Sequence, residues 1–166
     1  MKKLNNKGFS LVELIIVIAI MAVLIVVLAP QYLKYVEKSR NSTDITNATE
    51  IVTALQVYAG DPDADEELPS SDVEITITDA GNYTATDAFV KAALIESGLA
   101  DSTGVLPTRC LSRSNWNVYQ ITVEPDGVGG LKFSYQAGTG GTVETTAGTA
   151  TKAFQNAMAG KKADAD

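Results

Sequence analysis

An uninterrupted apolar stretch near the N-terminus constrains the fold of this chain more than any other feature. The 16 residues from 14 to 29 include no polar side chain, with Glu13 directly before them and Pro30 directly after. A helix of that length covers about 24 Å, whereas a start at Phe9 gives about 32 Å, enough to cross a hydrocarbon core of about 30 Å. The sequence therefore predicts a membrane-spanning helix over residues 9–30, with the Glu13 carboxylate near one interface. At the helix centre a buried acid costs about 2.5–3.5 kcal/mol.

Two simpler interpretations of this stretch are a cleaved secretory signal and a plain membrane anchor. Basic residues lie on both sides of it: Lys2, Lys3 and Lys7 before, and Lys34, Lys38 and Arg40 after. A secretory signal also needs a cleavage site of small residues, but the helical pattern continues beyond Pro30. A plain anchor fits the length. Because basic residues are balanced on the two sides, they do not decide the orientation of the helix. The short basic segment before it and the long acidic domain after it favour a cytoplasmic N-terminus.

Composition narrows the chemistry of the remaining chain. The net charge is −7, which argues against direct nucleic-acid binding. The chain has no histidine, and Cys110 is the only cysteine, so an intrachain disulfide, a Cys/His nucleophile pair and a standard zinc site are excluded. We expect Cys110 to be a small buried apolar residue. No arrangement of side chains suggests catalysis, so we expect neither an enzyme nor a cofactor.

One weak calcium signal occurs where Asp61, Asp63 and Asp65 alternate. An EF-hand loop would place glycine where Glu66 stands and glutamate where Asp72 stands, so the pattern departs from that motif. Three acids near the C-terminal loop, Glu124, Asp126 and Glu144, are an equally weak set. We therefore predict no metal site.

Beyond Pro30 the apolar periodicity predicts that the helix continues to residue 59. Proline removes the amide that would bond the Val26 carbonyl, so a kink or local loosening is expected there. One stripe of the helix is apolar: Ala48, Val52, Leu55 and Ala59, with Ile51 and Tyr58 beside them. The run Gly60-Asp61-Pro62 predicts the end of the helix.

The rest of the chain predicts an antiparallel sheet, and hence an α+β fold with one long helix packed on it. Alternating residues predict strands at 73–78, 116–124 and 131–137, with a turn at 79–82 and a glycine-rich hairpin loop at 125–130. A short helix is expected from Thr86-Asp87 to about Ser97, ended by Gly98. The inward residues of the last two strands are expected to be Tyr119, Ile121, Val123, Leu131, Phe133 and Tyr135. Residues 137–151 either add an edge strand or remain loose, and the tail 161–166 is expected to be flexible.

The chain reads Lys7-Gly8-Phe9-Ser10-Leu11-Val12-Glu13-Leu14, with a short basic leader before this motif and the apolar stretch behind it. This motif resembles the class III signal of type IV prepilins and pseudopilins. The resemblance implies that a membrane-embedded prepilin peptidase cleaves between Gly8 and Phe9 on the cytoplasmic side and then methylates the new amine of Phe9. The resemblance also implies a pilin-like fold.

Cleavage offers a role for Glu13, since it places an ammonium on Phe9 at a helix start, where the dipole disfavours a cation. The Glu13 carboxylate is four residues on and could pair with its own chain's amine. The resemblance implies instead that it meets the amine of a neighbouring subunit during assembly, with Pro30 also placed in the assembling helix. A third interpretation is a helix-start acid that stabilises only its own dipole.

Together these interpretations predict a structural subunit of a type IV pilus. Its parts would be a leader (1–8), a membrane and filament-core helix (9–30) and a globular head (31–160), followed by the flexible tail. The head would comprise the second half of the helix (31–59), a connecting region (60–115) and a sheet (116–151). Expected partners are further copies of the chain, prepilin peptidase, the pilus assembly platform and its ATPase. The precursor would reside in the cytoplasmic membrane and the assembled subunit in a surface filament. Two alternatives are a pseudopilin of a type II secretion or competence system and a monomeric membrane-tethered binding module.

Overall fold

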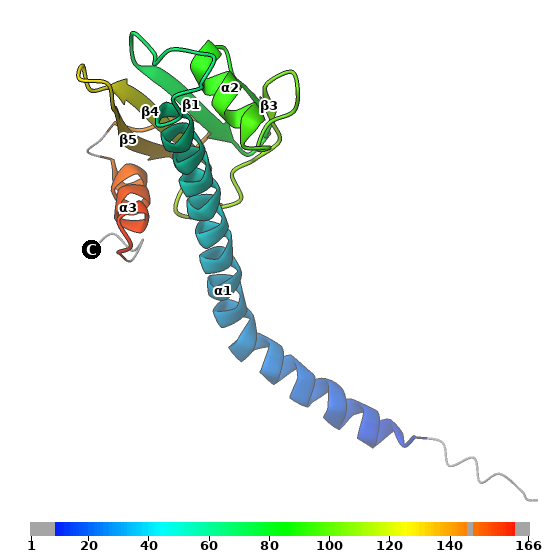
Figure 1. The fold of residues 1–166 in the computed structure, drawn as a ribbon. Coiled ribbons are helices and arrows are strands. Elements are labelled where there is room, and N and C mark those ends of the chain that lie inside the picture. Colours follow the sequence, from blue (N-terminus) through cyan, green and yellow to red (C-terminus); the bar gives the residue numbers. More distant parts are fainter. Residues whose placement is uncertain (1–8, 146–147, 162–166) are drawn as a thin grey trace, which may run out of the picture. The chain divides into compact units, whose positions relative to one another are not determined.

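The computed structural model describes residues 9–145 and 148–161 of the 166-residue chain (Figure 1). Its contacts divide the chain into two compact units, Met1–Lys38 and Ser39–Asp166. Helix α1, Leu11–Ala59, contributes to both units and continues through Pro30. No side chain that the structure describes in the first unit is buried, whereas the second unit has a single hydrophobic core.

In the second unit, α1 presents to the core the stripe that the periodicity predicts. Ala48, Ile51, Val52, Leu55 and Tyr58 are buried, and only Ala59, at the end of the helix, is partly exposed. The helix ends at the predicted place. The Gly60 amide donates to the carbonyl oxygens of Gln56 and Val57, and the Asp61 amide donates to that of Tyr58.

A three-stranded antiparallel sheet forms the other side of the core. Its strands are β1 (Val73–Thr78), β4 (Val118–Pro125) and β5 (Leu131–Gly138), in the order β1-β4-β5. Ile121 in the central strand pairs with Ile75 on one side and Tyr135 on the other. The predicted first strand and hairpin are confirmed, although β4 begins at Val118 instead of Trp116. The sheet also differs from the expected range 116–151, because it includes β1 and ends at Gly138.

The two faces of the sheet have different chemistry. Ile75, Tyr119, Ile121 and Val123 are fully buried on the face that meets α1. On the opposite face, cross-strand pairs are polar: the Gln120 amide donates to the Thr76 hydroxyl over 3.0 Å, and the Ser134 hydroxyl donates to the Glu124 carboxylate over 2.7 Å. This alternation fixes the register, because a slip of one residue would exchange the two faces.

Helix α2, Ala88–Glu96, confirms the predicted short helix. The Asp87 carboxylate caps its start by accepting the Val90 amide over 3.0 Å, and Gly98 follows its end with a φ of 73°. Such a positive φ favours glycine. Beside α2 lies a small ribbon that the sequence did not predict, formed by β2 (Tyr83–Thr84) and β3 (Val105–Leu106). Two residues are too few to show an alternating pattern.

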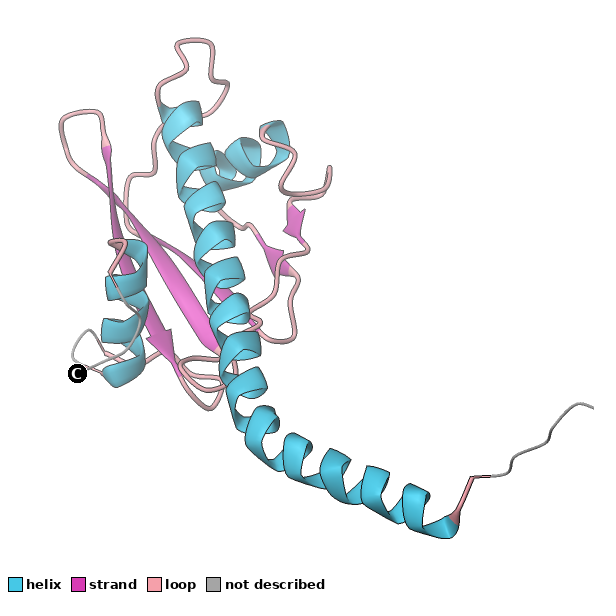
Figure 2. Ribbon diagram, turned by 90° about the horizontal axis from the view of Figure 1, so that it is seen from below, coloured by secondary structure: helices cyan, strands magenta, loops and turns pink. Residues whose placement is uncertain are grey.

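The expectation that residues 137–151 add a strand or remain loose is wrong at its C-terminal end, where α3 (Thr149–Met158) begins. Ala150, Ala153 and Phe154 bury one face of α3, and the Phe154 ring stacks on Tyr119 with centroids 5.0 Å apart. Figure 2 shows α3 and the second half of α1 on the same face of the sheet. The helical spacing was inconspicuous because alanines carry most of it. The predicted flexible tail lies outside the described residues from 162 onward.

The predicted inward face of β5 is only partly correct. Leu131, Phe133 and Tyr135 do pack against the core, but each stays partly exposed, and Ala137 is the fully buried residue. Strand β5 lies at the edge of the sheet, so one side of it has no neighbouring strand to cover these large side chains.

Candidate processing and assembly site

The start of α1 is a capping box built from the residues of the N-terminal motif. The Ser10 amide donates to the Oε2 atom of Glu13 over 2.8 Å, and the Ser10 hydroxyl accepts the Val12 amide over 3.4 Å. The Ser10 carbonyl accepts the Leu14 amide over 3.2 Å, which closes the first helical turn. Serine followed three residues later by glutamate is the sequence signature of this cap, so the pattern Ser10-x-x-Glu13 predicts it.

This geometry supports the interpretation of Glu13 as a helix-start acid. The cap uses only one of the two oxygens of the Glu13 carboxylate. Oε2 satisfies the Ser10 amide, whereas Oε1 has no partner among the described residues. An ionised carboxylate can accept about four hydrogen bonds, so a further donor can still bind. The Phe9 side chain is 92% exposed directly before the cap. The Glu13 carboxylate therefore lies beside the residue that would carry the new amine.

The proposed cleavage point lies at the edge of the described structure. Phe9 is described, whereas Gly8 and the rest of the leader lie outside the described residues. Cleavage between Gly8 and Phe9 and methylation of Phe9 accordingly remain predictions. A cut there would leave the capping box intact, because both hydrogen bonds of the box join residues downstream of the cut.

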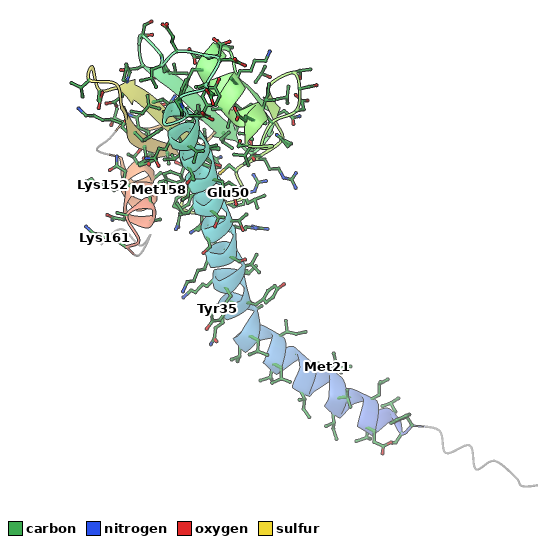
Figure 3. The ribbon with its side chains drawn as sticks, viewed as in Figure 1. Met21, Tyr35, Glu50, Lys152, Met158 and Lys161 are labelled. Atoms are coloured by element: carbon green, nitrogen blue, oxygen red, sulfur yellow. The ribbon has the colours of Figure 1, made fainter. Side chains whose placement is uncertain are left out.

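Behind the cap, α1 presents apolar side chains around its whole circumference. Every residue from 11 to 30 is exposed, and large side chains such as Ile15, Met21 and Leu28 expose more than half of their surface. Met21 projects outward from the helix in Figure 3. Among the described elements, α1 is long and apolar enough to cross a membrane by length and composition. A surface of this kind needs lipid or other apolar helices around it.

Pro30 lies inside α1 and is exposed. The helix is assigned without interruption on both sides of it, although proline cannot donate to the Val26 carbonyl. One turn later the surface changes character, since Tyr32, Leu33 and Tyr35 are exposed beside Lys34. Pro30 therefore lies near the end of the purely apolar surface. The loosening expected at Pro30 and its role in assembly remain predictions.

A buried carboxylate ties α1 to the head, and sequence reasoning missed it. Asp44 is fully buried and accepts four hydrogen bonds. The donors are the Leu111 amide (2.8 Å), the Ser112 amide (2.9 Å), the Trp116 indole nitrogen (3.0 Å) and the Cys110 thiol (3.4 Å). An acid on the helix face next to the apolar stripe was the only signal. Its partners lie more than 65 residues away, where no local pattern can identify them.

Two other groups beside Asp44 have strongly perturbed titration. Cys110 is fully buried, as predicted, and burial together with the Asp44 carboxylate raises the pKa of its thiol far above the usual value. The same causes raise the pKa of Tyr119. The Tyr119 hydroxyl is buried and has no hydrogen-bond partner among the described residues. A thiol that stays protonated is a poor nucleophile, so this cluster serves structure rather than reactivity.

Four of the six acids that gave weak calcium signals, Asp61, Glu124, Asp126 and Glu144, accept hydrogen bonds. Asp61 accepts the Asp63 amide over 2.9 Å, and Glu144 accepts the Ala150 amide over 3.1 Å. Asp126 accepts the Gly130 and Val128 amides across the hairpin loop, which lowers the pKa of its carboxyl. In the described part of the chain, no three acidic, cysteine or histidine residues gather closely enough to hold a metal ion.

Comparison with known proteins identifies the N-terminal segment. The family model described as the prokaryotic N-terminal methylation motif matches residues 3–29, which include the capping box and the apolar stretch. No solved structure matched the chain. The motif points to a structural protein that is a substrate of prepilin peptidase. Over residues 3–29 the chain thus carries the prokaryotic N-terminal methylation motif, the class III signal of type IV pilins.

Proposed function

We propose that the chain is a structural subunit of a type IV pilus, polymerised through the apolar half of α1. The observation that carries this proposal is the apolar surface of residues 11–30, which is exposed on every side of the helix directly behind the matched motif. A plain anchor would need lipid around this surface permanently. A helix that leaves the bilayer for a filament exchanges lipid for the helices of other copies, which are equally apolar.

The capping box supports a specific role for Glu13 in that exchange. In a single chain, one carboxylate oxygen already accepts the Ser10 amide, so the acid is partly satisfied before assembly. The second oxygen can then accept the methylated Phe9 amine of a neighbouring subunit. In a filament core without water an unpaired ammonium would be costly, and this pairing removes the penalty.

The proposed sequence of events assigns a role to each part of the chain. Residues 1–8 are removed by prepilin peptidase, and residues 9–30 anchor the precursor in the cytoplasmic membrane. The assembly platform and its ATPase then move the subunit into a surface filament. Residues 31–160 form the head on the outside of the filament, with the tail 161–166 at its end.

Intact-mass measurement of material sheared from the cell surface tests the proposal. The expected chain begins at Phe9 and has one added methyl group on its amine. A chain that begins at Met1 or after Ala29 would contradict the processing. A correctly processed chain that stays in the envelope, with none in sheared filaments under any growth condition, would contradict the pilus assignment.

A further inference from the structure

The head contains an open groove between the second half of α1 and the end of α2. Its volume is about 630 Å³, and all of its lining residues belong to the second unit of the chain. Thr46, Thr49 and Thr53 line it along α1. The apolar residues of the lining are Ile45, Ala54, Val57, Tyr58, Ala93 and Leu99. The Val57 side chain is 68% exposed. The size is typical of a binding groove.

The three threonines contribute mainly apolar surface to the groove. Each hydroxyl donates to the carbonyl oxygen four residues earlier in α1, over 2.9 Å for Thr46 and 2.8 Å for Thr49 and Thr53. A hydroxyl that is bonded to its own helix has little capacity left for an occupant. The remaining surface that these residues offer is largely their methyl groups. The groove therefore favours an occupant with an apolar body.

Three carboxylates also belong to the lining of the groove. Glu50, Asp61 and Glu96 line the groove and are exposed. Glu50 projects from α1 in Figure 3. Neither Glu50 nor Glu96 forms a salt bridge in the described part of the chain. The groove thus combines apolar lining residues with negative charge, which is complementary to an apolar side chain next to a cation.

Among the described residues, 32–35 form an exposed segment of that kind. Tyr32, Leu33 and Tyr35 expose 67%, 65% and 70% of their surfaces, and the exposed Lys34 lies between them. The chain as a whole is acidic, with 20 Asp and Glu against 13 Lys and Arg, so two copies repel each other over most approaches. The electrostatic interaction between this basic aromatic segment and the acidic groove is attractive instead.

We propose that the groove binds the segment Tyr32–Tyr35 of a second copy, with Lys34 directed at the Glu50 and Glu96 carboxylates. This inference rests on the proposed filament function, and it adds a contact between subunits outside the apolar helix bundle. All copies enter the membrane in one orientation, so their helices run parallel. Tyr35 and Thr53 are eighteen residues apart in α1, so the two copies in contact are offset by about 27 Å along the helix.

Cysteine cross-linking in filaments tests the contact. The full chain is expressed with Tyr35→Cys and Thr53→Cys together, while Cys110 is kept because it is fully buried and protected from oxidant. The matched control pairs Tyr35→Cys with Val128→Cys, since Val128 is 88% exposed and does not line the groove. Mild oxidation of sheared filaments should give cross-linked dimers and higher multimers with the first pair and monomer with the control.

Charge reversal supplies an independent readout. Lys34→Glu should lower the cross-linking yield roughly fivefold, the order expected for losing exposed ion pairs. Adding Glu50→Lys and Glu96→Lys to the same chain should restore it. These changes are all at exposed positions, so they leave the core of the head intact.

The outcomes separate this proposal from the proposed function. Normal filaments in which the groove pair cross-links no better than the control would overturn the groove contact and leave the pilus assignment standing. Cross-linking of Thr53→Cys to a different protein would also overturn it. If the unaltered, processed chain never forms filaments, the pilus assignment fails, and the contact between copies fails with it.

Discussion

Replacement of Asp44 by alanine should destabilise the head more than any other single change at a polar residue. Asp44 accepts hydrogen bonds from the Leu111 and Ser112 amides, the Trp116 indole and the Cys110 thiol. Alanine removes every acceptor and leaves the donors in place. Because Ser112 and Trp116 are fully buried, water cannot replace Asp44 without opening the fold.

The size of the effect follows from the donors left without partners. Each buried unsatisfied donor costs about 1–3 kcal/mol. Three donors belong to fully buried residues, although the Cys110 thiol is a weak donor, and the Leu111 amide is partly buried. We therefore expect a loss of about 3–5 kcal/mol in the free energy of unfolding. Domains of this size have about 5–15 kcal/mol in total, so the variant should keep a reduced but measurable transition. Asp44→Asn should be less severe, because one oxygen remains, but its amide nitrogen would face a donor.

Urea unfolding of the full chain in detergent, followed by tryptophan fluorescence, measures this effect. Trp116 is the only tryptophan, and its indole contacts Asp44 directly, so the signal reports on this site. The control is Glu50→Ala on the same helix, an exposed acid that should change stability by less than about 0.5 kcal/mol. If Asp44→Ala changes the free energy of unfolding by less than about 1 kcal/mol and leaves its dependence on urea concentration unaltered, core packing alone holds residues 110–116 in place.

Three further predictions concern Glu13, Tyr119 and Cys110. Glu13→Ala should leave membrane insertion and cleavage after Gly8 intact but give few or no filaments where it is the only copy, as immunoblots of membrane and sheared fractions would show; normal filament yield would reduce Glu13 to its helix cap. Tyr119→Phe should leave the free energy of unfolding unchanged or raise it by up to about 1 kcal/mol, because the buried Tyr119 hydroxyl has no partner among the described residues. A loss above about 1 kcal/mol in urea unfolding would reveal a partner. Burial raises the pKa of the Cys110 thiol above its ordinary 9.0, so above pH 9 only the unfolded chain loses the proton and the free energy of unfolding should fall. Cys110→Ala should make this fall less steep in urea unfolding at alkaline pH. An unchanged dependence on pH would contradict the raised pKa.

Much of the fold could be predicted because its signals are local. The apolar stretch, the stripe from Ala48 to Tyr58 and the stop at Gly60 repeat at helical spacing, and the structure has one helix there. β1 and the β4–β5 hairpin alternate with a period of two, and in the hairpin the short loop also limits the register. The motif that contains Gly8, Phe9 and Glu13 was likewise legible as a string of adjacent residues.

Elements with weak local signals were missed or misjudged. Helix α3 depends on Ala150, Ala153 and Phe154, and alanine contributes too little hydrophobic contrast to reveal a face. The ribbon of β2 and β3 has two residues on each strand, and its pairing joins Tyr83 to Leu106 across the whole of α2. In both cases tertiary contacts stabilise an element that its own sequence does not specify.

The candidate sites divide along the same line. The sequence by itself determined the signal, the apolar helix and the carboxylate four residues after Phe9, because all three depend on residues adjacent in the chain. Only the tertiary structure decided that Asp44 is a buried acceptor for a loop more than 65 residues away. It alone placed Glu50 and Glu96, from two different helices, in the lining of one groove. Hydrogen bonds and grooves of this kind form between distant segments, and their partners are chosen by packing rather than by spacing in the sequence.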